Sequence, residues 1–229
     1  MTRRIYKLIT ILLLITVSAR GYCQNESLIK GRIIDTLEVK DNTLKVRVLW
    51  MADTLKITMQ DKAPSFDFEA INKKRGDKYA FRTEKQRQTY MKLMKFSGQN
   101  CYAYALEKYF SCNGLSEQSI FNKRTRINGK TIHQIVDHCF EEILSFPTQP
   151  KRNLKMKLPD NVLLAFFNKS DWLIHAIYYS EGVFYTKNGV LEPSEFSDLK
   201  KFLKVNYWDT KTIKVYRFDK SKLNLASHL

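Results

Sequence analysis

Hydrophobic and polar residues alternate along three short segments near the start of the chain. Residues 43–50 place four apolar side chains on one face and charged side chains on the other. Residues 33–39 and 55–59 repeat this period of two, and polar residues separate the three segments. Such alternation is typical of half-buried strands joined by short turns. The pattern therefore predicts an antiparallel β-meander over residues 28–60.

The pattern then changes to a helical period. A helix is expected to begin near Asn100, with an apolar stripe formed by Tyr102, Ala105, Leu106 and Tyr109. Another helix is expected over residues 131–144, with its stripe formed by Ile132, Ile135, Val136, Cys139 and Ile143.

A further helix is expected after a basic stretch. Thr83 and Gln86 have the spacing of a capping box, and Tyr90, Met91 and Met94 would face inward. Residues 71–95 hold nine basic and two acidic residues. This charge is interpreted either as a solvated helix face or as a strip that docks on an anionic surface.

Strand patterns dominate the last third of the chain. Expected strands cover residues 162–167, 172–179, 183–187 and 213–218, and Ser180, Glu181 and Gly182 have the composition of a short hairpin turn. A small sheet, then helices, then an antiparallel sheet indicates an α+β fold. Residues 25–229 are expected to form one domain, with the meander at 28–60 as its extension, because so few residues cannot easily bury a core of their own.

The first residues of the chain and its charge predict where the protein is located. Arg3, Arg4 and Lys7 precede an apolar run and small residues, which is typical of a secretory signal peptide over residues 1–24. The expected location is periplasmic or secreted, with no transmembrane span after signal removal; lipidation of Cys23 is the alternative. Removing residues 1–24 takes away four basic residues and no acidic ones, which lowers the formal charge from +16 to +12. Such a field attracts polyanions such as phosphate polymers, nucleic acid or an anionic envelope surface, and charge alone does not choose among them. Nucleic acid is not expected, because the basic residues are dispersed and no nucleic-acid motif occurs.

The cysteines and histidines suggest a catalytic pair. Cys101 follows a turn-forming stretch and is expected in the first turn of its helix, where the helix dipole would lower the pKa of its thiol. His175 stands alone inside an apolar strand, and its alternative interpretation is a core histidine with satisfied hydrogen bonds. Cys112 and Cys139 are expected to be buried thiols or to form a disulfide with each other. No metal-binding, phosphate-loop or dinucleotide motif is present, so neither a metal nor an organic cofactor is expected.

Two segments resemble the NlpC-type superfamily of papain-like peptidases and amidases. Residues 98–106, Gly-Gln-Asn-Cys-Tyr-Ala-Tyr-Ala-Leu, are similar to its nucleophile helix. Residues 159–167 and 175–184 are similar to the segment that leads into a strand and to the histidine-bearing hairpin that follows. The matching parts cover roughly 40 of the 229 residues. The resemblance implies a papain-like fold in which the nucleophile helix packs on an antiparallel sheet.

The resemblance also implies site residues and an activity. Cys101 matches the nucleophile and His175 the general base, while the orienting position falls on Thr186. Asn188 is expected to take that role, because its carbonyl could accept a hydrogen bond from the imidazole N–H. The expected function is a secreted cysteine hydrolase, an amidase or endopeptidase, that cuts peptide-type amide bonds in cell-wall peptides. The alternative is a non-catalytic, basic envelope-binding or interaction protein on the same fold.

Overall fold

The computed structural model describes residues 31–40, 43–51, 53–60, 69, 82–94, 98–115, 120–189 and 191–221. The expected signal peptide, Cys23 and most of the basic stretch before Arg82 lie outside these residues. The fold is α+β, with two antiparallel sheets and few helices, as the sequence predicts.

The predicted meander forms most of the smaller sheet. Its strand order is β1-β2-β3-β4, and each described pairing is antiparallel. The strands are β1 (Arg32–Lys40), β2 (Thr43–Trp50), β3 (Asp53–Gln60) and β4 (Thr125–Arg126). The short β4 comes from much later in the chain, just before the helix that begins at Gly129. Its pairing with β3 joins the meander to that segment.

The larger sheet has six antiparallel strands in the order β5-β10-β6-β7-β8-β9. The strands are β5 (Phe140–Pro147), β6 (Val162–Phe167), β7 (Leu173–Ser180), β8 (Val183–Lys187), β9 (Pro193–Phe196) and β10 (Thr212–Phe218). The predicted hairpin turn is confirmed, since Ser180 pairs with Val183. Glu181 and Gly182 have φ angles of 52° and 81°, the left-handed conformation that a tight two-residue hairpin turn requires.

The helices match the prediction at their starts better than at their ends. They are α3 (Glu84–Met94), α4 (Cys101–Cys112), α5 (Gly129–Cys139) and α6 (Leu199–Asn206), with a 3-10 turn η2 at Lys151–Lys155. The capping box at α3 is confirmed, because Gln86 N–H donates to Thr83 Oγ1 at 3.2 Å and Thr83 N–H to Gln86 Oε1 at 3.1 Å.

Two predictions about these helices are wrong. The helix expected to reach residue 144 ends at Cys139, and Phe140 begins β5, which pairs with β10 along its whole length. Sheet pairing thus overrides a local pattern that fits either element. Met91 of α3 does not face inward, since it is 39% exposed; the side chains of Tyr90 and Met94 lie outside the description.

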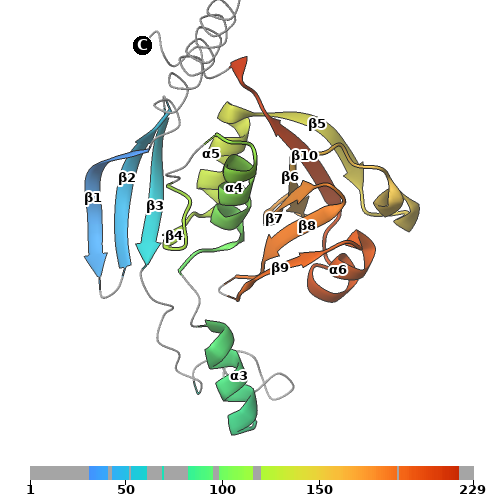
Figure 1. Ribbon diagram of the computed structural model, residues 1–229, viewed down its shortest axis with the longest axis horizontal. Helices are drawn as coiled ribbons and strands as arrows, with labels where there is room; N and C mark the ends of the chain where they lie inside the picture. Colours follow the sequence, from blue (N-terminus) through green and yellow to red (C-terminus); the bar gives the residue numbers. More distant parts are fainter. Residues whose placement is uncertain are drawn as a thin grey trace, which may run out of the picture.

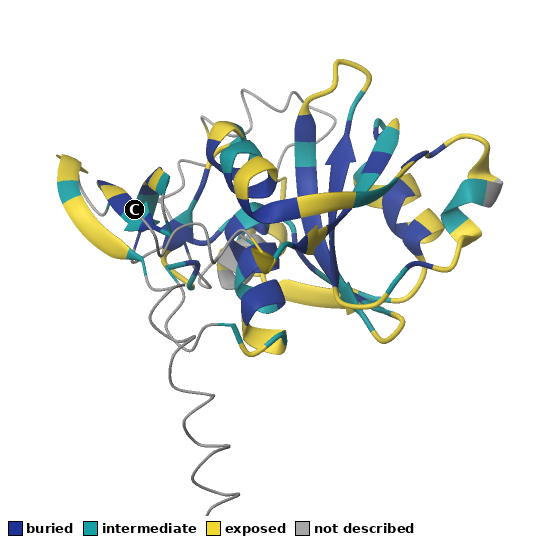
Figure 2. Ribbon diagram, turned by 90° about the horizontal axis from the view of Figure 1, so that it is seen from above, coloured by how far each residue is buried: buried dark blue, intermediate teal, exposed yellow. Residues whose placement is uncertain are grey.

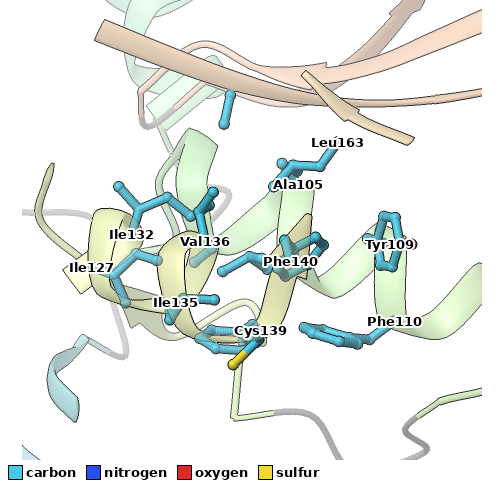
Figure 3. Close-up of a cluster of buried hydrophobic side chains, with 14 of the residues drawn as sticks. Ala105, Tyr109, Phe110, Ile127, Ile132, Ile135, Val136, Cys139, Phe140 and Leu163 are labelled. Atoms are coloured by element: carbon cyan, nitrogen blue, oxygen red, sulfur yellow. The ribbon is translucent and has the colours of Figure 1, made fainter. Parts of the chain in front are cut away.

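The helices α4 and α5 lie between the two sheets (Figure 1). Apolar residues of β2 and β3, both helices and one face of the large sheet form a single buried cluster. Figure 3 shows Ile132, Ile135 and Val136 of α5 on one side of Phe140, and Tyr109 and Phe110 of α4 on the other, within this cluster. Trp50 of β2 contacts Phe110 edge-on, with ring centroids 5.7 Å apart. The meander therefore covers the outer side of the α4–α5 layer.

The opposite face of the large sheet is covered by α6. Phe202 and Leu203 of this helix pack on Leu164, Phe166 and Val215 in a second buried cluster. Figure 2 shows that buried residues concentrate at the centre of the molecule and on the inward sides of the helices. The large sheet thus has two buried faces, one toward α4 and one toward α6.

Candidate active site

The amino end of α4 is fixed by Asn100, and this places Cys101. The Asn100 side chain accepts a hydrogen bond from Ala103 N–H at 3.3 Å, as an N-cap residue does. Its amide also donates to the carbonyl of Ile127 at 2.7 Å. At Gly98, an added Cβ would lie 2.4 Å from the carbonyl oxygen of Gln60, so only glycine permits this close approach to β3. Cys101 is the first residue of the helix, as the sequence predicts.

The thiol of Cys101 is nearly buried, with 9% of the residue exposed. Burial raises its pKa to about 11, while backbone N–H groups of Ala176, Tyr102 and Cys101 and the charge of Lys187 act in the opposite direction. The predicted lowering of the thiol pKa is therefore wrong for the resting protein, because desolvation outweighs the helix terminus. The backbone N–H of Ala176, which follows His175 in β7, is the first of the groups that favour the thiolate.

His175 is fully buried in β7, among aromatic rings. Its imidazole stacks on Tyr207, with ring centroids 4.1 Å apart. Its Nε2 lies 2.8 Å from Thr186 Oγ1, and its Nδ1 has no hydrogen-bond partner in the described part of the chain. Burial lowers the pKa of His175 to about 3, so the ring is neutral at physiological pH.

Thiol and imidazole approach β7 from different faces of the large sheet. Ala176 belongs to the buried cluster that contains α4, whereas His175 contacts Phe166 and Phe202 in the cluster beneath α6. Among the described residues, no hydrogen bond joins the Cys101 sulfur to either ring nitrogen. The structure thus places Cys101 and His175 on different sides of β7 and does not join their side chains.

The structure places Thr186, not Asn188, on the imidazole. Asn188 Oδ1 instead accepts a hydrogen bond from Tyr207 Oη at 3.1 Å. The expectation for Asn188 fails because β8 ends at Lys187, so the strand alternation that would put residues 186 and 188 on one face no longer applies. Asn188 therefore holds Tyr207, which stacks on His175, rather than His175 itself.

Two side chains near the thiol were not anticipated from the sequence. Lys187 is completely buried, and its ammonium group donates to the carbonyl of Leu191. Tyr102 Oη donates to the carbonyl of Leu173 at 2.7 Å, which ties the start of α4 to the start of β7. The sequence signal for Lys187 is a lysine that ends an otherwise apolar strand, a pattern shared with many exposed strand ends.

The remaining cysteines do not form the disulfide considered from the sequence. No disulfide joins Cys112 to Cys139, and Cys112 is exposed rather than buried. Cys139 is buried on the apolar stripe of α5, as predicted. Exposed His138 pairs with Asp53 at 2.6 Å. Within the described ranges, no three His, Cys, Asp or Glu side chains group together as metal ligands.

Comparisons with known proteins identify no relative. No family model matches the chain, and neither a curated protein nor a solved structure is significantly similar to it. In the part of the chain that the structure describes, no helix is both long and apolar enough to cross a membrane.

Proposed function

We propose that this protein is a secreted cysteine hydrolase that cuts peptide-type amide bonds, with cell-wall peptides as the substrate class. The observation that carries the proposal is the position of Cys101. Cys101 is the first residue of α4, so its sulfur lies at the amino end of the helix, and nearby backbone N–H groups favour its negatively charged form. The resemblance of residues 98–106 and 175–184 to papain-like proteins supports an amidase or peptidase activity.

The N–H groups around the sulfur can stabilise negative charge. Helix N–H groups in the first turn have no intrahelical acceptor, and the helix dipole points its positive end toward the same place. Such donors serve in catalysis when charge develops on a thiolate or on the oxygen of a tetrahedral intermediate. A buried sulfur surrounded by donors fits a nucleophile better than a simple core thiol, which needs none of them.

In the proposed reaction, the sulfur of Cys101 forms a bond to the amide carbonyl carbon while the thiol proton passes to Nδ1 of neutral His175. That proton then goes to the leaving nitrogen as the carbon–nitrogen bond breaks, which leaves a thioester. Water cleaves the thioester, gives the carboxylic acid and returns the proton to sulfur. Thr186 on Nε2 orients the ring, in the role first expected for Asn188. Because the two side chains lie on different faces of the large sheet, this step requires a rearrangement of β7 that turns the imidazole toward the thiol.

A second candidate is a non-catalytic, basic envelope-binding protein. It is favoured by the aromatic surroundings of His175 and by the absence of a described hydrogen bond between thiol and imidazole. In that case Cys101 and His175 are core residues, and the positive charge alone gives affinity for anionic wall material, weakened by salt.

Turnover separates the two candidates. The protein would be incubated with soluble wall peptides, and newly released amines and carboxylates would be identified by mass spectrometry. The hydrolase predicts new termini with the wild-type protein and none with Cys101→Ala, while Cys112→Ala, the matched control, remains active. If wall peptides stay intact but wall material is retained in a salt-sensitive way, the binding protein is the correct account.

A further inference from the structure

Positive charge is concentrated in three segments at the end of the large sheet where β5 and β6 stop and β7 and β10 begin. These segments are residues 148–157, 168–172 and 199–211, which together are termed the basic surface. Their 28 residues hold nine basic and two acidic side chains, so about an eighth of the chain carries +7 of its formal charge of +16. Eight of the nine basic residues are lysines, and each of these lysines is exposed.

Hydrogen bonds and packing join the three segments. Thr148 N–H donates to the carbonyl of Lys211 at 2.9 Å, and Lys211 N–H donates at 2.7 Å to the carbonyl of Phe167, just before the second segment. Leu154 of η2 packs on the buried cluster that contains Phe202 of α6. Figure 1 shows α6 at the end of the molecule opposite to β1. The three segments are therefore neighbours in space, far from the small sheet.

The basic surface also exposes large apolar side chains. Trp172, Val205 and Trp208 are 71%, 70% and 80% exposed, and Met156 is 40% exposed. The third tryptophan of the chain, Trp50, is buried. Two of the three indoles thus face solvent among lysines, although tryptophan is highly buried on average. Such a mixture of cations and exposed apolar groups is typical of a contact surface.

Hydrogen-bonded turns carry both exposed indoles. Asn168 Oδ1 accepts a hydrogen bond from Trp172 N–H at 3.1 Å. Trp208 lies in a turn that Thr210 N–H closes by donating to the carbonyl of Tyr207 at 3.1 Å. The backbone at each indole is therefore ordered before any partner binds, which lowers the entropic cost of binding.

We propose that the basic surface docks the protein on an anionic lipid bilayer. The lysine ammonium groups lie over the lipid phosphates, which attract basic side chains near a bilayer surface. The indoles sit at the level of the headgroups, where tryptophan is enriched in membrane-associated proteins. An anionic wall polymer would account for the lysines but not for exposed Trp172, Val205 and Trp208. This contact does not involve Cys101, so it goes beyond the proposed hydrolysis and does not depend on it.

The first test is co-sedimentation of the full chain with vesicles of equal parts phosphatidylglycerol and phosphatidylcholine. Lys200→Gln combined with Lys204→Gln is expected to weaken vesicle binding by about tenfold or more, because each lysine near an anionic bilayer contributes to affinity. Lys40→Gln combined with Lys56→Gln is the matched control, since it removes the same charge from exposed positions of the small sheet and should stay close to wild type. All variants share the apolar run near the start of the chain, so its contribution cancels.

Tryptophan fluorescence tests the placement of the indoles. On the anionic vesicles, emission should shift to shorter wavelength and quenching by acrylamide should fall, because Trp172 and Trp208 leave water while Trp50 is already buried. Trp172→Ala combined with Trp208→Ala should abolish the shift and weaken vesicle binding. The melting curve of this double variant should stay close to wild type, because both side chains are exposed.

Three outcomes would overturn the proposal. If both pairs of lysine substitutions weaken binding equally, affinity follows net charge rather than this surface. If emission of the vesicle-bound protein is unchanged, the indoles do not enter the bilayer. If the chain ignores vesicles but binds anionic wall polymer through Lys200 and Lys204, the partner is the polymer. Cys101→Ala should bind vesicles as wild type does, so this proposal and the proposed hydrolase can fail separately.

Discussion

The two faces of the large sheet hold buried polar groups in different ways. Beneath α6, His175 is surrounded by Phe166, Phe202 and Tyr207, and one hydroxyl satisfies one of its nitrogens. Toward α4, Cys101 starts the helix and buried Lys187 donates a hydrogen bond to the carbonyl of Leu191. The first face keeps its ionisable group neutral, whereas on the second face Lys187, with a pKa of about 8, stays mostly protonated at neutral pH.

The difference teaches that burial alone does not decide the charge of a group. All three residues are buried, and desolvation is the largest influence on each pKa. Aromatic rings offer His175 no strong compensation, so its pKa falls well below the ordinary value. Backbone dipoles and opposite charge partly compensate at the α4 face. The nucleophile of the proposed reaction therefore belongs to the α4 face, and its general base, His175, to the α6 face.

The largest expected effect comes from removing the nucleophile on the α4 face. Cys101→Ala should reduce amide hydrolysis at least about a thousandfold, because no other group can form the thioester. Melting curves should remain close to wild type, since alanine fits the same first-turn position. If Cys101→Ala retained more than a tenth of the wild-type activity, the nucleophile would not be on the α4 face.

Trp50→Ala tests whether the meander supports the α4 face selectively. The indole is buried and contacts Phe110 and Phe121, so its loss should cost about 3–5 kcal/mol of unfolding free energy. Urea unfolding measures the loss. Amide exchange should increase first in α4 and α5, and later in α6. Equal loosening of both faces would show that the meander stabilises the molecule as a whole.

The pH dependence of stability tests the neutral state of His175. Its folded pKa of about 3 lies below the ordinary 6.5, so the unfolded chain binds a proton that the folded chain refuses. The stability contributed by the neutral ring is complete above pH 6.5 and is lost as pH falls toward 3. The slope attributable to this residue is about 1.4 kcal/mol per pH unit. In His175→Gln, urea unfolding between pH 4 and 6 should lose that slope; an unchanged slope would mean that His175 accepts protons in the fold.

A smaller effect distinguishes the two candidate orienting residues. Thr186→Val leaves a buried imidazole nitrogen without its partner and should cost about 1–3 kcal/mol. Asn188→Ala, the comparison variant, loses a half-buried contact with Tyr207 and an exposed one with Asn206, and should cost less than about 1 kcal/mol. Thermal unfolding of both variants gives the ranking. If Asn188→Ala lost more unfolding free energy than Thr186→Val, Asn188 would be the residue that orients the imidazole.

Much of the fold follows from local pattern. The meander and the strands at 162–167 and 183–187 are predicted because alternation, a continuous apolar run and short turns are all properties of adjacent residues. Residues 140–144 are misassigned because Phe140, Ile143 and Leu144 fit a helical stripe, while their actual partner, β10, lies some 70 residues later. β9 and α6 carry too short a pattern to be recognised.

For the candidate site too, the local features could be predicted from the sequence and the tertiary ones could not. Cys101 at a helix start and His175 within a strand are readable from turn residues and apolar runs. Which face His175 occupies depends on the strand register relative to α4 and α6, and the thiol pKa depends on burial between them. Both are tertiary properties. Lys187 is missed for the same reason, since only packing shows that a strand-end lysine is buried.

The central claim is that Cys101 forms a covalent bond with an amide substrate. Wild-type protein would be mixed with a soluble wall peptide, quenched in acid within seconds and analysed by peptide mass spectrometry. The account predicts an acyl mass on Cys101 that appears with substrate, decays as product forms and never occurs on Cys112 or Cys139. Substrate turnover without any adduct on Cys101, or an adduct confined to exposed Cys112, would contradict it.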